Sequence, residues 1–470
     1  MEKRKMKIGL LLLAGQWLET IGANKGFYSS LPQILKSDAL KIKKLLPEDT
    51  EVIDPGIVNS REKAAKAAAL FKEKGADAIL ISYLAWGEDW LFLEAIKNLP
   101  ETPVLLWSCV PSSELPKSFD MVQLFRYSGP VGAMQASGPL KRMGRKFCVI
   151  SGSTENKETA DEIKKFVRAA EVTSKLKNLT VGLLPSVCDS MSGTHIEEKT
   201  LKKQLGISVK HISLEEYCKS SESIFAGEVK KCADFLKRQY KVEVSDKALL
   251  KGARASLGLL RILDKYNLRA LAFNDLDEKL HIKCGLRPCL AIPGIFEKTV
   301  ISMEGDVGAA AAMYILRELT GKSPMYTEIF TYDEKENAFL AGHAGILDAP
   351  ALVQSAKYIR IVKDYEYMEV EKDTAAMQFT AKSGTVTMLN IFFTGKEFQM
   401  FVLRGKSVRS GKNFDISPSI YIKPEINVNE FMKKVMSFGT TQHWAVVHQD
   451  AVKELKSLED AGLNMTNIEI

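Results

Sequence analysis

Residues 51–82 read EVIDPGIVNSREKAAKAAALFKEKGADAILIS, and this stretch decides the fold class. An apolar run at Glu51–Asp54 precedes a helical pattern over Arg61–Lys74, and a second apolar run follows at Ala78–Ser82. Such alternation of strand and helix is typical of a parallel sheet that carries helices on both faces. The stretch therefore predicts a doubly wound α/β domain.

The same alternation continues on both sides of this stretch. In the first third of the chain, further strands are predicted at Lys7–Leu13, Pro103–Trp107 and Phe147–Ser151, and a helix at Lys157–Ala170. A second block starts near Leu179 and contains strand-like Val209–Ile212, helical Asp246–Tyr266, strand-like Ala270–Phe273 and a helix at about Gly305–Leu319. Two Rossmann-like domains are therefore predicted.

The pattern changes after about Pro324. β-rich or alternating segments follow at Tyr358–Val362, Ala376–Ala381, Thr385–Phe393, Gln399–Arg404 and Ser419–Ile422. Period-two alternation favours an antiparallel sheet or barrel. We therefore predict an α/β fold in which two doubly wound domains, residues 1–175 and 176–324, precede a β-rich, barrel-like domain at residues 325–470.

The composition excludes several classes of protein. Of 470 residues, 46% are hydrophobic and 26% charged, as in ordinary globular proteins. Lys and Arg number 65 and Asp and Glu 58, so the net charge is 65 − 58 = +7. No basic block concentrates this excess, and no apolar run reaches the ~20 residues that span a bilayer. Neither a nucleic-acid partner nor a membrane partner is predicted.

The N-terminus and the cysteines bear on the compartment. The basic residues before Ile8–Ala14 resemble a short signal peptide, but a buried first strand has the same pattern, and we favour the strand. No Cys-x-x-Cys occurs among the seven cysteines, which we interpret as reduced thiols. A cytoplasmic protein is expected. The cysteines are Cys109, Cys148, Cys188, Cys218, Cys232, Cys284 and Cys289.

Four residues carry the kinds of side chain that bind metal ions. Glu304 follows a predicted strand at Lys298–Ser302, and Glu328 lies between apolar and aromatic residues. His343 and His443 stand at predicted strand ends. Two carboxylates and two imidazoles suit Mn²⁺, Fe²⁺, Co²⁺ or Zn²⁺. For either histidine taken alone, a hydrogen-bonded histidine without a metal is the alternative.

At these positions the sequence resembles the L-arabinose isomerase family, within the L-fucose/L-arabinose isomerase superfamily. The resemblance includes Glu304-Gly305-Asp306 before an Ala-rich helix, Glu328–Tyr332 followed by Gly342-His343, and Gln442-His443 with His448 five residues on. Further similar segments are Asp189–Met191 with Thr194 and Glu197, Gln16 after the first strand, and Phe273–Leu276.

The resemblance implies an aldose–ketose isomerase of carbohydrate metabolism that works through an ene-diol. It implies a three-domain subunit, a homo-oligomer (trimer or hexamer) and a divalent cation, usually Mn²⁺ but alternatively Co²⁺, Fe²⁺ or Zn²⁺. By carry-over, Glu304, Glu328, His343 and His443 would bind the metal. Glu304 and Glu328 would also form the acid/base pair that moves protons on a small sugar substrate.

Departures from the family's motifs indicate a rebuilt substrate pocket. Gln442 replaces the first of two paired histidines, Trp17 replaces a histidine, and Leu124–Gly129 lacks the glutamine and histidine of the corresponding stretch. The candidate substrate-binding residues are Gln16, Trp17, Trp86, Arg126, Tyr127, Met191 and Phe273. Arg126 would suit a phosphate or sulfonate, with an ordinary ion pair as the alternative. For the aromatic residues, core packing is the alternative.

Two other functional classes remain open from the sequence. Two doubly wound lobes also occur in sugar-binding proteins without catalysis, although those need no set of two glutamates and two histidines. A metal-dependent carbohydrate epimerase or lyase would begin with the same proton abstraction as an isomerase. Only the identity of the product separates these enzymes.

Overall fold

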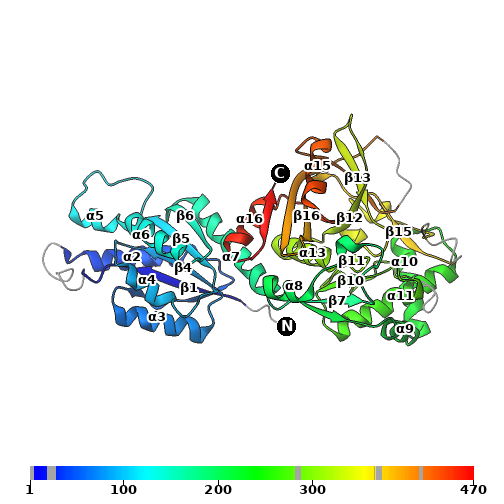
Figure 1. The fold of residues 1–470 in the computed structure, drawn as a ribbon, viewed down its shortest axis with the longest axis horizontal. Helices are drawn as coiled ribbons and strands as arrows, with labels where there is room; N and C mark the ends of the chain where they lie inside the picture. Colours follow the sequence, from blue (N-terminus) through cyan, green and yellow to red (C-terminus); the bar gives the residue numbers. More distant parts are fainter. Residues whose placement is uncertain are drawn as a thin grey trace. The chain divides into compact units, whose positions relative to one another are not determined.

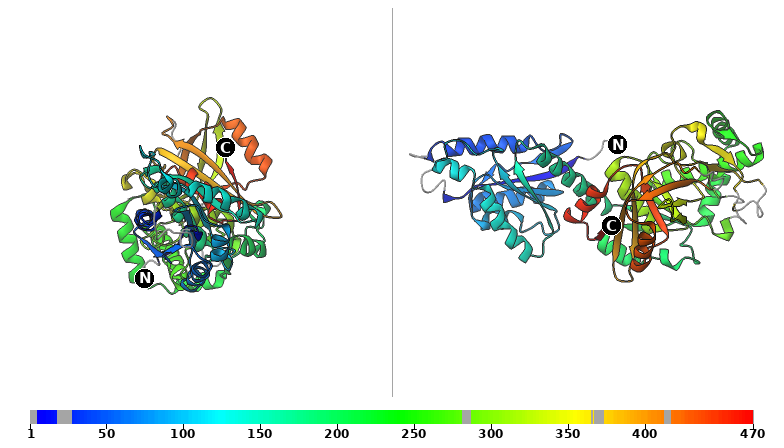
Figure 2. Two further views of the ribbon diagram at one scale, coloured as in Figure 1. Left: turned by 90° about the vertical axis from the view of Figure 1, so that its left-hand side faces the viewer. Right: turned by 90° about the horizontal axis from the view of Figure 1, so that it is seen from above.

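The structure, a computed structural model, describes residues 5–17, 28–280, 287–364, 366, 373–411 and 417–469. The chain forms two compact units (Figures 1 and 2). The first unit is Met1–Lys175 with Glu454–Leu463, and the second is Leu176–Lys453 with Asn464–Ile470. Each unit has its own sheets, which are described in turn.

The first unit is built on a parallel sheet of strand order β2-β1-β4-β5-β6, and β3 also pairs with β1. The strand β1 is apolar and buried along almost its whole length, as a central parallel strand requires. The strands are β1 (Met6–Leu13), β2 (Thr50–Ile53), β3 (Ile57–Val58), β4 (Ala78–Tyr83), β5 (Val104–Val110) and β6 (Phe147–Ser153).

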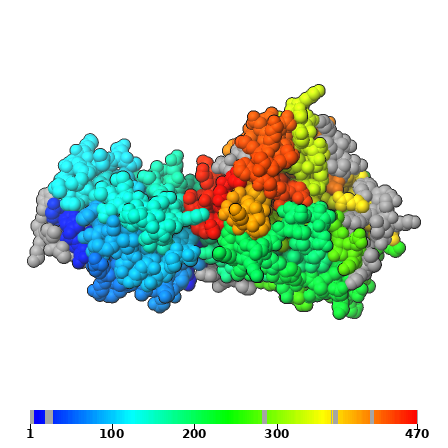
Figure 3. Space-filling model, viewed as in Figure 1, coloured from blue at the N-terminus to red at the C-terminus, as the bar shows by residue number. Residues whose placement is uncertain are grey.

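Helices surround this sheet. They are α2 (Leu31–Lys43), α3 (Arg61–Lys74), α4 (Asp89–Ile96), α5 (Met121–Arg126), α6 (Gly129–Arg142), α7 (Lys157–Leu176) and α16 (Val452–Asp460). The region of α5 and α6, cyan in Figure 3, lies on the surface and carries exposed apolar side chains. In α3, Ser60 caps the N-terminus and left-handed Gly75 ends the helix, so this helix has the predicted bounds.

The second unit begins with a parallel sheet of strand order β11-β10-β7-β8. Its strands are β7 (Thr180–Leu184), β8 (Ser208–His211), β10 (Ala270–Phe273) and β11 (Val300–Met303). The helices of this part are η2 (Ser192–Thr194), α8 (Glu198–Leu205), α9 (Leu214–Glu222), α10 (Ala226–Gln239), α11 (Asp246–Lys265) and α13 (Val307–Thr320).

The rest of the second unit is mainly antiparallel. The strand path β16-β19-β12-β13-β18-β17 is closed by pairing of β16 with β17, which makes a barrel, and β20 adds to β17. Its strands are β12 (Met325–Asp333), β13 (Ala338–Gly342), β16 (Gly384–Phe393), β17 (Phe398–Ser407), β18 (Ser419–Pro424), β19 (His443–Val447) and β20 (Thr466–Glu469).

Smaller elements complete the second unit. A three-stranded sheet consists of β9 (Lys241–Val242), β14 (Arg360–Val362) and β15 (Ala376–Gln378). The remaining helices are α14 (Ala349–Leu352), η3 (Ala356–Tyr358) and α15 (Val428–Phe438).

Helix α13 joins the parallel sheet to the barrel. It contacts β10 and β11 on one side and β16 and β19 on the other (Figure 1). Its residues Val307 to Leu316 are all buried, since the alanines let strands approach from both sides. The turn between β11 and α13 therefore lies where the two sheets of this unit meet.

The predicted fold class agrees with a mixed α/β structure that has parallel sheets and a β-rich C-terminal region. The predicted central and C-terminal domains lie in one compact unit, and the three-domain division stays a prediction. The helix predicted from Gly305 begins at Val307, because Glu304 and Gly305 both have positive φ.

The cysteines differ in part from the expectation. Cys109, Cys148, Cys188, Cys232 and Cys289 are free thiols. Cys218 is disulfide-bonded, which corrects the interpretation that all cysteines are reduced, and Cys284 lies outside the described residues. In the described part of the chain, no helix is both long and apolar enough to cross a membrane.

Candidate metal and catalytic site

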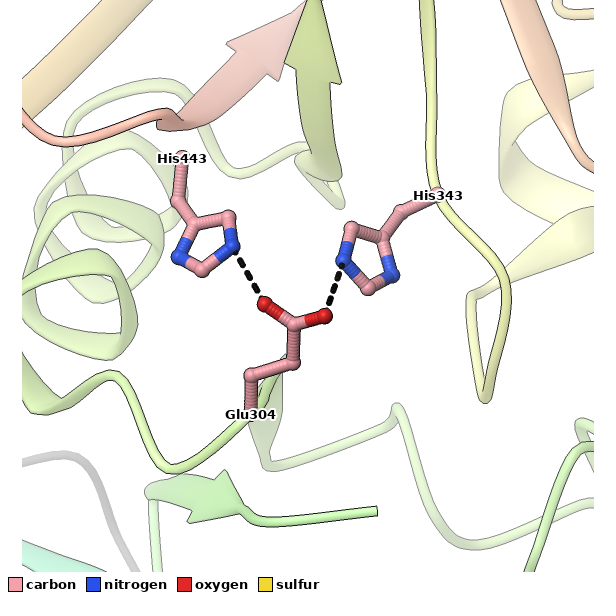
Figure 4. A group of neighbouring side chains, drawn as sticks. All are labelled: Glu304, His343 and His443. Carbon is pink, nitrogen blue, oxygen red and sulfur yellow. Dashed lines mark ion pairs between the residues drawn. The ribbon is translucent and has the colours of Figure 1, made fainter. Parts of the chain in front are cut away.

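Three buried side chains converge in the second unit: Glu304, His343 and His443 (Figure 4). Each offers one ligand atom, and the three atoms lie within 4.8 Å of one another. Oε2 of Glu304 is 2.7 Å from Nε2 of His443, and Oε1 is 3.6 Å from Nε2 of His343. These residues are only 7%, 5% and 1% exposed, in the order Glu304, His343, His443.

The three residues come from three strand ends. Glu304 directly follows β11 of the parallel sheet, His343 follows β13, and His443 begins β19 of the barrel. Ligands of parallel sheets characteristically bind beyond the carboxyl ends of the strands, where Glu304 is placed. The site thus forms where the carboxyl end of one sheet meets the antiparallel strands.

Glu304 has an unusual backbone conformation. Its φ is +59°, that of Gly305 is +70°, and the N–H of Asp306 donates to the carbonyl of Met303 at 3.2 Å. Two successive positive φ angles closed by this bond are features of a type I′ turn, which favours Gly, Asn and Asp. At Gly305 a Cβ would lie 2.5 Å from the carbonyl oxygen of Ser186. A glutamate held there against its backbone preference indicates a functional role.

Hydrogen bonds on the far side orient both imidazoles. Nδ1 of His443 lies 2.9 Å from Oδ2 of Asp306, and Nδ1 of His343 lies 2.7 Å from the carbonyl oxygen of Ala344. If each Nδ1 carries the proton and donates it there, each Nε2 is left as a free lone pair toward Glu304. The ring of Tyr326 packs against both imidazoles, at 4.6 and 4.9 Å. Metal-binding histidines commonly donate the N–H of their other ring nitrogen to a carboxylate or a backbone carbonyl, as Asp306 and Ala344 provide here.

Asp306 has two roles. Its Oδ1 accepts from the N–H of Ala309 at 2.8 Å and caps α13. Its Oδ2 is the partner of His443. A single buried carboxylate therefore ties the start of α13 to the imidazole.

The carboxylate of Glu304 and the imidazoles beside it shift one another's pKa values. Burial opposes ionisation of Glu304, but the close contacts and charge of His343 and His443 outweigh it and lower its pKa to about 2. Burial likewise opposes protonation of His443, yet Asp306 and Glu304 raise its pKa to about 9. The pKa of His343 is raised by Glu304 against the effect of burial. Positive charge on the imidazoles therefore stabilises the ionised Glu304, and a cation bound among the three side chains would take over that role.

The donor atoms fit a divalent cation. Oε2 of Glu304 and Nε2 of each histidine are buried, and apart from the ion pairs among these three residues they have no hydrogen-bond partner among the described residues. Three buried donor atoms that face one another in this way can hold a cation between them. One carboxylate oxygen with two imidazole nitrogens suits Mn²⁺, Fe²⁺, Co²⁺ or Zn²⁺.

Glu328 is outside this group of three, but it lies close by in the sheet. In β12 it stands opposite His443 of β19 and opposite Gly342 of β13. Directly paired residues of antiparallel strands project from the same face, so Glu328 and His443 share one face. Glu328 is half-buried. Its assignments as fourth ligand and as acid/base group stay predictions.

Two candidate substrate-binding residues lie in the second unit. Sδ of Met191 accepts from Nε2 of Gln442 at 3.2 Å, which places Met191 against the residue before His443. Phe273 is fully buried, with its ring 6.0 Å from that of Tyr217. This placement favours core packing for Phe273 over contact with a sugar.

The other candidates lie in the first unit. The backbone N–H of Gln16 donates to Oε2 of Glu88 at 3.0 Å, and Trp17 packs against Phe125 with ring centroids 4.4 Å apart. Nε1 of Trp86 donates to Oε1 of Gln135 at 2.9 Å. The hydroxyls of Tyr127 and Ser112 lie 2.7 Å apart. Gln16 and Trp17 follow β1 and Trp86 follows β4, so these three stand beyond the carboxyl ends of neighbouring parallel strands.

Arg126 is already paired. Its Nε and Nη2 donate to the two carboxylate oxygens of Asp38 at 2.8 and 2.9 Å, and Asp38 is buried. These hydrogen bonds raise the pKa of the guanidinium. The ion pair that the sequence left as the alternative is therefore present, and it neutralises the charge that an anionic substituent would need.

Replacement of Arg126 by Ala is accordingly expected to reduce stability. The buried carboxylate of Asp38 would lose its two donors and be left with Lys41 at 3.8 Å, and a buried acceptor that loses its hydrogen bonds costs about 1–3 kcal/mol. Chemical denaturation should show a loss in this range, while the affinity for Mn²⁺ stays unchanged. Unchanged stability together with loss of binding of a phosphorylated or sulfonated sugar would instead identify Arg126 as a substrate-binding residue.

Sequence comparisons find sugar isomerases among the proteins that are similar to this chain. Residues 33–177 match the family model described as fucose/sulfoquinovose isomerase, N-terminal domain. Sulfoquinovose isomerase of Priestia aryabhattai is 23% identical over 426 residues, which cover 87% of this chain and 89% of that protein. The sulfoquinovose isomerase of Alkalicoccus urumqiensis is 21% identical over 388 residues, 81% of this chain and 84% of that protein. L-arabinose isomerase of Yersinia pestis is 22% identical over 357 residues, which cover 71% of this chain and 69% of that protein.

Proposed function

We propose that this chain, a distant member of the fucose/arabinose isomerase-like superfamily, is a metal-dependent aldose–ketose isomerase. The relatives are named as isomerases of sugars, which indicates an aldose–ketose isomerase. The observation that carries the metal-dependent chemistry is the convergence of Glu304, His343 and His443, whose buried ligand atoms face one another.

The reaction needs two proton transfers. A base removes the proton from C2 of the aldose and returns it to C1, while a second group moves the proton between the hydroxyl and carbonyl oxygens, through an ene-diol. Glu304 is ionised at neutral pH and supplies one carboxylate. Glu328 projects from the same face as His443 and supplies the second carboxylate. Such groups each contribute about 10²–10⁴-fold to the rate.

The remaining residues hold the site. His343 and His443 would bind the cation through Nε2, because Ala344 and Asp306 engage their Nδ1 atoms. When bound, a divalent cation such as Mn²⁺, or Co²⁺, Fe²⁺ or Zn²⁺, stabilises negative charge that develops on the substrate oxygens. Tyr326 is fully buried beside both imidazoles and keeps water from that side of the site. A homo-oligomer of such subunits is part of the proposal.

Solvent exchange tests this function directly. The purified, metal-stripped protein is incubated in D₂O with Mn²⁺ and a pool of aldoses and ketoses that includes sulfoquinovose and L-arabinose. Metal-dependent entry of deuterium at C2 of an aldose or C1 of a ketose, with interconversion of the two, is the expected result in NMR spectra.

The other outcomes separate the alternatives. Exchange with inversion at C2 and no ketose would indicate an epimerase. Tight binding of a sugar without exchange, in the presence of bound Mn²⁺, would indicate a sugar-binding protein. Exchange that persists in a chelator without added metal would contradict the proposed role of the cation.

A further inference from the structure

We propose that Asp275, held in place by Arg287, is a positioning residue that fixes the backbone of Glu304 and thereby sets the affinity of the site for its cation. The inference rests on the proposed metal site. It concerns residues outside the three converging side chains. It gives a role to the buried charged residues Asp275, Arg287 and Asp364, which take no part in the proposed reaction.

Asp275 uses its two carboxylate oxygens in two directions. Oδ1 accepts from the backbone N–H of Glu304 at 3.1 Å, and Oδ2 accepts from Nη1 of Arg287 at 2.6 Å. Asp275 and Arg287 are 0% and 1% exposed, so water does not weaken either bond. Hydrogen bonds to charged groups are the strongest class in proteins.

The topology brings Asp275 to this position. It follows β10 by two residues, and Phe273 of β10 pairs with Met303 of β11 in the parallel sheet. Asp275 and Glu304 thus leave neighbouring strands at the same edge. The N–H of Asp275 also donates to the carbonyl of Phe273 at 3.2 Å, which gives this short segment a fixed geometry.

The guanidinium of Arg287 is held in place by two further carboxylates. Its Nε and Nη2 donate to the two oxygens of Asp364 at 2.8 and 3.0 Å, and Nη2 also donates to Glu366 at 2.7 Å. A guanidinium is a planar, rigid group of donors. Once Asp364 holds one edge of it, Nη1 points in one direction, and Asp275 cannot rotate without loss of that bond.

Glu304 needs such an anchor because its conformation is strained. A non-glycine residue at positive φ is strained and persists only where its surroundings hold it. Tyr326 donates to the carbonyl of Met303 at 3.2 Å, and Ser302 donates to the carbonyl of Asp306 at 2.7 Å. These bonds hold the turn on either side of Glu304. Among the bonds of the described residues, that from Asp275 acts on Glu304's own amide.

Titration with Mn²⁺, followed by calorimetry and by electron paramagnetic resonance, tests the proposal. Asp275→Ala is expected to weaken Mn²⁺ binding about 10- to 100-fold and to change the resonance spectrum of the bound ion, since the carboxylate of Glu304 is no longer held. Asp275→Asn keeps an oxygen that can accept from Glu304, so it should bind Mn²⁺ at least about threefold more tightly than Asp275→Ala.

Asp38→Asn is the matched control. Asp38 is also buried and also accepts two hydrogen bonds from an arginine, but its partners are Arg126 and Lys41 of the first unit rather than Glu304. Asp38→Asn should bind Mn²⁺ within about threefold of the unaltered protein, even where its melting temperature falls. Affinities are compared at a temperature at which circular dichroism shows all variants folded. If Asp275→Ala does not fold, the comparison of Asp275→Asn with Asp38→Asn decides.

The outcomes separate this proposal from the proposed function. Unchanged Mn²⁺ affinity in both Asp275 variants, or an equal loss in Asp38→Asn, would overturn the positioning role. Mn²⁺ binding without sugar isomerisation by the unaltered protein would contradict the proposed function alone. Failure of the unaltered protein to bind Mn²⁺ would overturn both.

Discussion

Glu304→Gln is expected to lower kcat by at least ~10², on the scale of a lost acid/base group. The amide cannot accept the proton that the carboxylate takes from the sugar, because its nitrogen and oxygen are not basic at neutral pH. The same change removes the negative charge between His343 and His443, so the affinity for Mn²⁺ should fall as well. Steady-state turnover and a Mn²⁺ titration on the folded variant measure the two effects.

Glu243→Gln is the control for this change. Glu243 is another glutamate of the second unit whose pKa is lowered to about 2, in its case chiefly by hydrogen bonds from Arg360 and Lys241 at the surface. Its replacement should leave kcat and Mn²⁺ affinity as they are. Normal turnover of Glu304→Gln would refute the assignment of Glu304.

Glu328→Gln is the second change with a large expected effect, again a loss of at least ~10² in kcat with the fold retained. Glu328 stands opposite His443 in the paired strands and projects from the same face of the sheet as that histidine. As a fourth ligand it would also contribute to Mn²⁺ affinity, so we expect that affinity to fall too. A loss of turnover with full Mn²⁺ affinity would limit Glu328 to proton transfer.

Glu336→Gln controls for Glu328→Gln. Glu336 lies in the turn between β12 and β13, the same hairpin, and pairs with Lys423 at 3.0 Å on the surface. Exposed pairs of this kind contribute about 0–1 kcal/mol, so neither stability nor turnover should change much. If Glu328→Gln behaves like Glu336→Gln, the second carboxylate of the mechanism must be sought elsewhere.

Local patterns were sufficient for most elements of the fold. The helix at Arg61–Lys74 and the strand at Ala270–Phe273 have the predicted bounds. The departures lie where backbone conformation depends on neighbours. Helix α13 starts at Val307 rather than at Gly305 because the turn before it, at Glu304 and Gly305, is held at positive φ by contacts from other strands.

The residues of the candidate site also fall into two groups, those that the sequence indicates and those that only the tertiary structure identifies. Residue types, their places at predicted strand ends and the family resemblance together pick out Glu304, His343 and His443 as candidate ligands. Asp275 belongs to a segment that resembles the family, but no local pattern assigns it a role, and Arg287 carries no signal at all. The one hint for Asp275 in the sequence is an acidic residue just beyond a buried parallel strand.

The sequence by itself determined the alternation of strands and helices, the change to β-rich structure after Pro324 and the ligand-type residues at strand ends. These depend on hydrophobic periodicity and local backbone preference, which neighbouring residues express on their own. Tertiary structure alone decided that positions 304, 343 and 443 meet, that Asp275 holds the amide of Glu304, and that Arg126 pairs with Asp38, 88 residues away. Such contacts depend on how whole sheets pack and on the need of buried charges for partners. Neither can be inferred from a short segment of sequence.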